Sequence, residues 1–121
     1  MNYEFKIIAF TDDADFAISL ATECNKYGFL LSYIDKVEDL QRELNKQTIT
    51  VVLIDLTYKK YDAFQLCDKI KLKHSIPVFG VLDMFSKKMQ EKAKKTGYDL
   101  IFTKKMLLKS IREVVIHVSN E

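Results

Sequence analysis

Short apolar segments alternate with longer amphipathic segments along the whole chain. The clearest apolar segment is residues 50–57, where an unbroken apolar run over residues 51–54 ends at Asp55. Its length and its β-branched residues predict a strand that is buried on both faces, as in a parallel sheet. Periodicity alone leaves a short helix open here, but the β-branched content and the polar residues that follow favour the strand.

The other apolar segments predict four more strands. The first alternates apolar and polar residues before it becomes fully apolar, and Pro77 opens the fourth, which is a position where a strand tolerates proline. In chain order, the expected strands cover residues 3–10, 29–34, 50–57, 78–82 and 100–102.

The segments between the strands carry helical periodicity and capping residues. Gly28 stands where the first helix should end, and Asp35 with Glu38 resembles a capping box for the second. Asp62 and Ser86 are the expected N-caps of the third and fourth helices. The apolar positions expected to face the core are Ala17, Leu20, Ala21 and Cys24; Val37, Leu40 and Leu44; Phe64, Cys67 and Ile70; Met89 and Ala93; and Leu107, Ile111, Val114, Val115 and Val118.

Strict alternation of strands and helices predicts an α/β fold with a parallel sheet. Because parallel crossovers are right-handed, we expect a doubly wound, five-stranded (βα)5 three-layer sandwich. The length of 121 residues fits a single domain over residues 1–121, without linkers or repeats.

The composition is that of a globular domain, with 48% hydrophobic and 30% charged residues. No stretch approaches the length of a membrane span and the N-terminus lacks the features of a signal peptide, so we expect a cytoplasmic protein without a membrane partner. Cys24 and Cys67 lie in apolar helical patterns and are expected to be buried free thiols. His74 and His117 show no ligand spacing and are expected at the surface.

The net charge of +2 is unevenly distributed, with −3 over residues 1–61 and +5 over residues 62–121. This difference indicates an acidic cluster in the first half and a basic face in the second. Without interleaved arginines or aromatic residues to stack bases, the basic segment favours a protein partner and makes nucleic acid an unlikely one. Its lysines are Lys87, Lys88, Lys92, Lys94 and Lys95.

Charged residues stand at the ends of three expected strands: Asp12 and Asp13, Asp55, and Lys104. If these strands are neighbours, three carboxylates converge with one ammonium, and such carboxylates need a cation. Oxygen ligands favour a hard cation, and Mg²⁺ fits. A carboxylate beside the metal can act as a nucleophile toward phosphorus, and Lys104 would balance the phosphoryl charge.

Each residue also has a simpler interpretation on its own. Asp12 and Asp13 could be an N-cap and a first-turn acid of the following helix. Asp55 could cap the loop after its strand, and Lys104 could be a solvated side chain. Only the joint pattern is specific to a site.

The whole chain resembles a response-regulator receiver domain of the CheY-like family. The resemblance lies in residues 7–13 (IIAFTDD), residues 52–57 (VLIDLT), Asp62 at the start of the third helix, residues 76–79 (IPVF) and the pair Thr103-Lys104. It implies the flavodoxin-like strand order 2-1-3-4-5.

The resemblance also implies roles for the charged residues. Asp55 would be the phosphoacceptor, and Lys104 would pair with the phosphoryl group. Asp12, Asp13 and Asp55, together with the backbone carbonyl of Thr57, would hold Mg²⁺.

Several positions depart from the family pattern. The family places a Ser or Thr after the fourth strand, where this chain has Leu82, and a small residue next, where it has Asp83. The aromatic switch position aligns with Ile101, or with Phe102 if the alignment shifts by one residue. The remaining departures are Lys59-Lys60 for Pro-Gly, Ala63 for Gly and Lys105 for Pro. The acidic residues of the family pattern are therefore present, while the residues that would respond to phosphorylation are altered.

The leading hypothesis is a receiver domain that accepts a phosphoryl group from a histidine kinase or a phosphotransfer protein and signals to a downstream protein target. Met106, Leu108 and Ile116 lie off the core stripe of the last helix, so a homodimer through the fourth and fifth helices is one contact that we consider. The alternative is a pseudo-receiver that acts as a phosphorylation-independent interaction module.

The sequence favours a protein that is not an enzyme. An aspartyl-phosphate phosphohydrolase needs a second acid two residues after its nucleophile, where this chain has Thr57. A flavin-binding domain would need a phosphate-binding loop after the first strand, but residues 11–15 are anionic and would repel phosphate.

Overall fold

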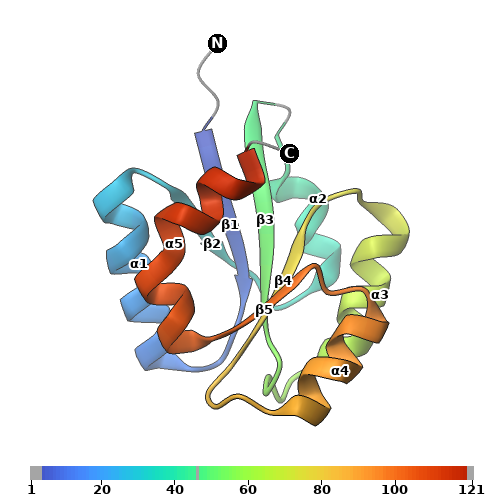
Figure 1. Cartoon of the computed structure of the whole chain (residues 1–121). Coiled ribbons are helices and arrows are strands. Elements are labelled where there is room, and N and C mark those ends of the chain that lie inside the picture. Colours follow the sequence, from blue (N-terminus) through green and yellow to red (C-terminus); the bar gives the residue numbers. More distant parts are fainter. Residues whose placement is uncertain (1–3, 46, 120–121) are drawn as a thin grey trace.

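The computed structural model describes residues 4–45 and 47–119, which form one parallel sheet between two layers of helices (Figure 1). The elements in chain order are β1 (Glu4–Phe10), α1 (Ala14–Tyr27), β2 (Leu30–Tyr33), the 3-10 turn η1 (Val37–Asp39), α2 (Leu40–Glu43), β3 (Thr48–Asp55), α3 (Ala63–Lys73), β4 (Val78–Leu82), α4 (Lys87–Thr96), β5 (Leu100–Thr103) and α5 (Lys104–Ser119). The strand order is β2-β1-β3-β4-β5, and all neighbouring strands are parallel. The predicted (βα)5 fold and strand order 2-1-3-4-5 are confirmed.

The two faces of the sheet carry two separate apolar cores. Helices α1 and α5 cover one face, while η1, α2, α3 and α4 cover the other (Figure 1). The central strand β3 supplies both cores, with Val51 and Leu53 on the first face and Val52 and Ile54 on the second. Because successive side chains of a strand point to opposite faces, an unbroken apolar run is what this position requires.

Three predicted helix ends are confirmed. The Asp62 carboxylate accepts hydrogen bonds from the first backbone amides of α3, and the Ser86 hydroxyl accepts one from α4. Gly28 follows α1 with a φ of 71°, a left-handed conformation that glycine adopts without a steric penalty.

The predicted capping box of the second helix is wrong, although its expected core residues Val37, Leu40 and Leu44 do face the core. Asp35 does not cap it, because the Asp35 carboxylate pairs with the Lys60 ammonium at 2.6 Å. The segment instead forms the turn η1 and the four-residue α2, and Leu40 still anchors it in the core. In α1 the predicted inward residue Ala21 is exposed, and Phe16 packs against the sheet in its place.

Within residues 4–45 and 47–119, no helix is long and apolar enough to cross a membrane. Cys24 and Cys67 are buried free thiols, as predicted. Burial raises the pKa of both thiols to about 11, so they stay protonated at neutral pH and are poor nucleophiles.

Tyr98 provides a test of the packing between α3 and the loop before β5. Its hydroxyl donates a buried hydrogen bond to the Ala63 carbonyl at 2.7 Å. Tyr98→Phe should lower the free energy of unfolding by about 1 kcal/mol, measured by urea denaturation. The control is Tyr33→Phe, because Tyr33 is exposed and water can replace its hydroxyl at the Ala17 carbonyl. Equal losses in both variants would contradict the importance of burial.

Candidate functional site

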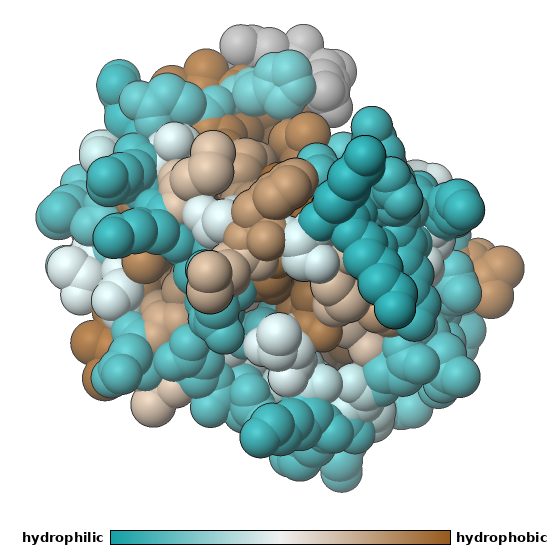
Figure 2. All heavy atoms as spheres, turned by 60° about the horizontal axis from the view of Figure 1, so that its bottom comes forward, coloured by the Kyte–Doolittle hydropathy of each residue, from teal (hydrophilic) through white to brown (hydrophobic). Residues whose placement is uncertain are grey.

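The charged residues meet at the carboxyl ends of four neighbouring strands. Asp13 lies just after β1, Asp55 ends β3, Asp83 follows β4, and Lys104 follows β5. The strand order changes direction between β1 and β3, because β2 lies on one side of β1, and β3, β4 and β5 follow on the other. Ligands of open α/β sheets bind outside the carboxyl ends of the strands at such a switch point. Figure 2 brings this end of the molecule forward and shows apolar side chains in a hollow near the middle of the view, with hydrophilic side chains around it.

Lys104 is the centre of this group. Its Nζ lies 2.8 Å from Asp55, 2.9 Å from Asp13 and 2.9 Å from Asp83, and only 10% of its side chain is exposed. Burial opposes the charged form of Lys104, but the hydrogen bonds to Asp55, Asp83 and Asp13 outweigh it, and the pKa of Lys104 lies above its usual value. The ammonium therefore stays charged at physiological pH.

Asp55 is almost completely buried, with 1% of its surface exposed, and both of its oxygens are hydrogen-bonded. The Thr11 hydroxyl and the Lys104 ammonium donate to Oδ2. The backbone N–H and the hydroxyl of Thr57 donate to Oδ1, at 3.0 Å and 2.7 Å. These four donors satisfy both oxygens, as a buried polar group requires.

Asp13 is the N-cap of α1, as its simpler interpretation predicts, and it also contacts Lys104. One oxygen caps α1 by accepting from the Phe16 backbone N–H, and the other accepts from Lys104. The hydrogen bond from Lys104, followed by that from Phe16, lowers the pKa of Asp13 below its usual value of 3.8. The N-cap of α1 and the charged group at the strand ends thus share one carboxylate.

Asp12 does not join this group, because its side chain is exposed and Lys104 contacts Asp13 and Asp55 instead. Within the described parts of the chain, no three carboxylate, imidazole or thiol groups gather so that they could hold a metal ion. The donors are nevertheless anionic oxygens, and this chemistry suits Mg²⁺. Binding by Asp12, Asp13 and Asp55 together requires side-chain movement from this structure and stays a prediction.

Two residues of the group were not assigned a role from the sequence. Thr11 donates to Asp55 and accepts from the backbone N–H of Asp13, so its hydroxyl links β1 to β3. In the sequence, Asp83 stands out only as a departure from the family pattern. Asp83 directly follows β4, and Lys104 directly follows the neighbouring strand β5. This placement is the sequence signal that the two side chains lie close together.

The switch positions lie beside the charged group. Leu82 is buried in the core under α3 and α4, and Ile101 packs against the same core. Phe102 faces the opposite core and contacts the Phe79 ring edge-on, at 5.9 Å between centroids. Ile101, and not Phe102, therefore shares a face with Leu82, which favours the unshifted alignment. Leu82 and Ile101 also line a pocket of about 350 Å³ between α4 and α5.

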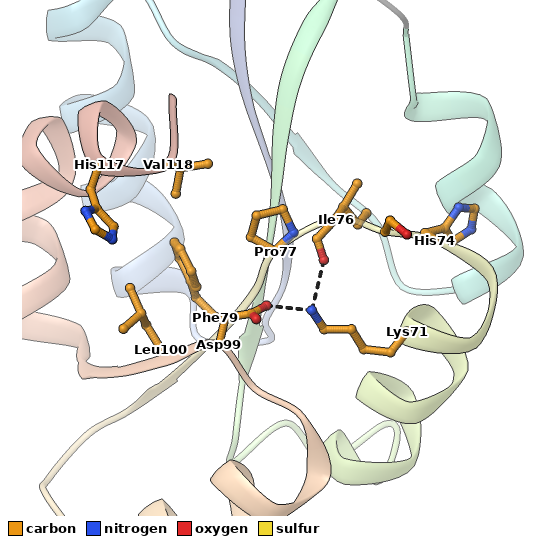
Figure 3. Close-up of a pocket in the computed structure, with 10 residues that line it drawn as sticks. Lys71, His74, Ile76, Pro77, Phe79, Asp99, Leu100, His117 and Val118 are labelled. Atoms are coloured by element: carbon orange, nitrogen blue, oxygen red, sulfur yellow. Dashed lines mark hydrogen bonds and ion pairs between the residues drawn. The ribbon is translucent and has the colours of Figure 1, made fainter. Parts of the chain in front are cut away.

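A pocket of about 550 Å³ lies at the other end of the sheet (Figure 3). Lys71 points into it from α3 and donates to the Asp99 carboxylate and to the Ile76 carbonyl. Asp99 also accepts from the Val78 backbone N–H, so these contacts join α3 to the starts of β4 and β5. We interpret them as structural, because none of the charged strand-end residues lines this pocket.

Comparison with solved structures identifies the fold as that of a response-regulator receiver domain. A two-component response regulator from Clostridium difficile matches with a TM-score of 0.81 and 16% identity over 98% of both chains. The receiver domain of the DNA-binding response regulator protein (merR) from Colwellia psychrerythraea 34H matches with a TM-score of 0.72 and 23% identity, over 93% of this chain and 99% of that one. The beryllofluoride-activated NtrC4 receiver domain dimer matches with a TM-score of 0.71 and 15% identity, over 93% and 98%.

A curated relative with a similar sequence is the uncharacterized transcriptional regulatory protein YvcP of Bacillus subtilis (strain 168), which is 24% identical over 100 residues. The alignment covers 83% of this chain and 42% of YvcP, so the chain spans less than half of that protein's length. No protein-family model matches the chain.

The pairing of Lys104 with Asp55 can be tested by a double-mutant cycle. Lys104→Met should lower the free energy of unfolding by about 3 kcal/mol, because it leaves the buried Asp55 without its counter-charge. Asp55→Asn in the same chain should recover most of this loss, and urea denaturation measures all four proteins. Additive losses would show that the two charges do not depend on each other.

The Asp13 carboxylate should contribute stability only above its lowered pKa. Asp13→Asn keeps an efficient N-cap but removes the charge that faces Lys104. Since the folded-state pKa lies below 3.8, the wild type should be more stable than Asp13→Asn at pH 7, and this advantage should shrink as the pH falls through that pKa. Unfolding measured across this range checks the sign, and an advantage that grows toward acid pH would contradict it.

Proposed function

We propose that this chain is the receiver domain of a response regulator in a two-component system, and that Asp55 is its phosphoacceptor. The observation that carries the proposal is the buried Asp55 carboxylate within 2.8 Å of the Lys104 ammonium, at the carboxyl ends of β3 and β5 of a receiver fold. The similarity to YvcP, which is named as a transcriptional regulatory protein, agrees with a regulatory role.

In the proposed reaction, an Asp55 oxygen forms a bond to phosphorus while the bond to the leaving group breaks and the leaving group departs with the electron pair. Lys104 then donates to a phosphoryl oxygen, which places a fixed positive charge where negative charge gathers. Thr57 holds the second Asp55 oxygen through its N–H and hydroxyl and fixes the orientation of the carboxylate.

Mg²⁺ belongs to this proposal as the cation for Asp12, Asp13, Asp55 and the Thr57 carbonyl. Bound there, it would neutralise part of the charge on the phosphoryl group. Asp13 and Asp55 already share one cation, the Lys104 ammonium, and this supports the view that their oxygens can share another.

The proposed partners are proteins: a histidine kinase or phosphotransfer protein as donor, and a downstream target. Met106 and Ile116 on α5 are exposed, whereas Leu108 is half-buried against the core. Met106 lines the pocket between α4 and α5 together with Gln90 of the lysine-rich α4, so this part of α5 offers a mixed apolar and basic surface. The dimeric NtrC4 receiver supports a homodimer as one use of it. Light scattering on the wild type and on Met106→Asp tests the dimer.

The second candidate is a pseudo-receiver that binds its partner without phosphorylation. Leu82 favours it, because an apolar side chain occupies the position where a receiver has a hydroxyl. The saturated hydrogen bonding of Asp55 points the same way, since a phosphoryl group must displace Lys104 or Thr11 from Oδ2, or Thr57 from Oδ1. Enzymatic turnover is not part of either proposal, because Thr57 and not an acid contacts Asp55 from the position two residues on.

Acetyl phosphate distinguishes the two candidates. With Mg²⁺, mass spectrometry should detect one phosphoryl group on the wild type and none on Asp55→Asn. The phosphorylated wild type should show small amide shifts in α4 and α5, because Leu82 offers no hydrogen bond to the new group. Leu82→Thr restores such a bond, worth about 1.5–3 kcal/mol, and should shift the equilibrium constant toward the active state by roughly ten- to a hundredfold.

Leu82→Val is the matched control, because valine has the shape of threonine without the hydroxyl. An unmodified wild type would favour the pseudo-receiver. Equal shifts in Leu82→Thr and Leu82→Val would show that the missing hydroxyl is not what limits the response.

A further inference from the structure

Asp83 is a third carboxylate on Lys104, beside Asp13 and Asp55. Leu82 pairs with Thr103 in the register of β4 and β5, so the next residues of the two strands, Asp83 and Lys104, emerge side by side. The Asp83 carboxylate lies 2.9 Å from the ammonium, and 65% of its side chain is exposed.

The three carboxylates use the full donor capacity of Lys104. An ammonium group has three N–H donors, and Asp55, Asp13 and Asp83 each lie within hydrogen-bond distance of it. A phosphoryl oxygen on Asp55 can bind Lys104 only if one of these contacts is given up or shared. Asp83 is the most exposed of the three, while Asp13 is also held by its cap on α1.

Electrostatic repulsion from Asp83 also disfavours a phosphoryl group on Asp55. A phosphoryl group brings about two negative charges at neutral pH to a place where Asp13 and Asp83 already face one ammonium. Like charges at this range repel, and since 65% of the Asp83 side chain is exposed, water screens part of its contribution. Asparagine at position 83 would keep the shape of the side chain and remove its share of the repulsion.

We propose that Asp83 competes with the phosphoryl group for Lys104, and thereby lowers the occupancy and the lifetime of phosphorylated Asp55. The inference rests on the proposed function and adds a residue that regulates it. When the phosphoryl group is lost, a water oxygen bonds to phosphorus, the bond to Asp55 breaks, and the electron pair returns to the carboxylate while the water proton passes to solvent. Asp83 favours this return, because it re-forms its ion pair with Lys104.

The experiment is a beryllofluoride titration at fixed Mg²⁺, followed by amide NMR, on the wild type and three variants. Asp83→Asn should bind beryllofluoride about three- to tenfold more tightly than the wild type. Asp83→Glu keeps the charge and should stay within about twofold of the wild type. Asp68→Asn, which removes an exposed carboxylate from α3, is the control for net charge and should not differ from the wild type.

A second measurement follows the loss of the phosphoryl group after acetyl phosphate is removed, and Asp83→Asn should retain it about three- to tenfold longer. Equal affinity and lifetime in the wild type and Asp83→Asn would overturn the inference while leaving the proposed function intact. Weaker binding by Asp83→Asn, or an equal gain in Asp68→Asn, would also overturn it. If neither the wild type nor any variant takes up beryllofluoride or phosphate, the proposed function fails, and this inference fails with it.

Discussion

The buried ion pair between Asp55 and Lys104 is the interaction on which the strand ends of this domain depend. A carboxylate with 1% exposure is costly without a counter-charge, and Lys104 supplies that charge from the carboxyl end of β5. Buried pairs of this kind are often no more stabilising than apolar residues of similar size. The position of this pair at the edge of a core of Val, Ile and Leu is therefore weak evidence for a purely stabilising role.

The same residues also fix the local structure. Asp13 caps α1 with one oxygen and binds Lys104 with the other, while Lys104 is the first residue of α5. The Thr103 hydroxyl accepts from the backbone N–H of Met106 in the first turn of that helix. Helices α1 and α5 pack side by side on one face of the sheet, so the charged group joins their beginnings to β3. A change in charge at Asp55 would reach both helices through Lys104.

Local patterns predicted the fold well because each element carries its own signal. The two-sided burial of β3 and the caps Asp62 and Ser86 follow from short stretches of sequence. Asp35 shows the limit of such signals, because its capping pattern was sound locally but Lys60, distant in sequence, binds its carboxylate. Thr11 and Asp83 were not assigned roles for the same reason, since their partners come from other strands.

In the proposed function, uptake of a phosphoryl group and response to it rest on different parts of the site. Uptake needs Asp55 and Lys104, and both are in place. Response normally needs a hydroxyl beside them, but Leu82 lies in an apolar core together with Ile101, where a polar side chain would need a partner of its own. Because Leu82 and Ile101 are apolar, a phosphoryl group would act on the first turn of α5 through its contact with Lys104. A receiver built in this way would pass its signal through the position of one ammonium group, and Asp83 would then set how readily that group moves.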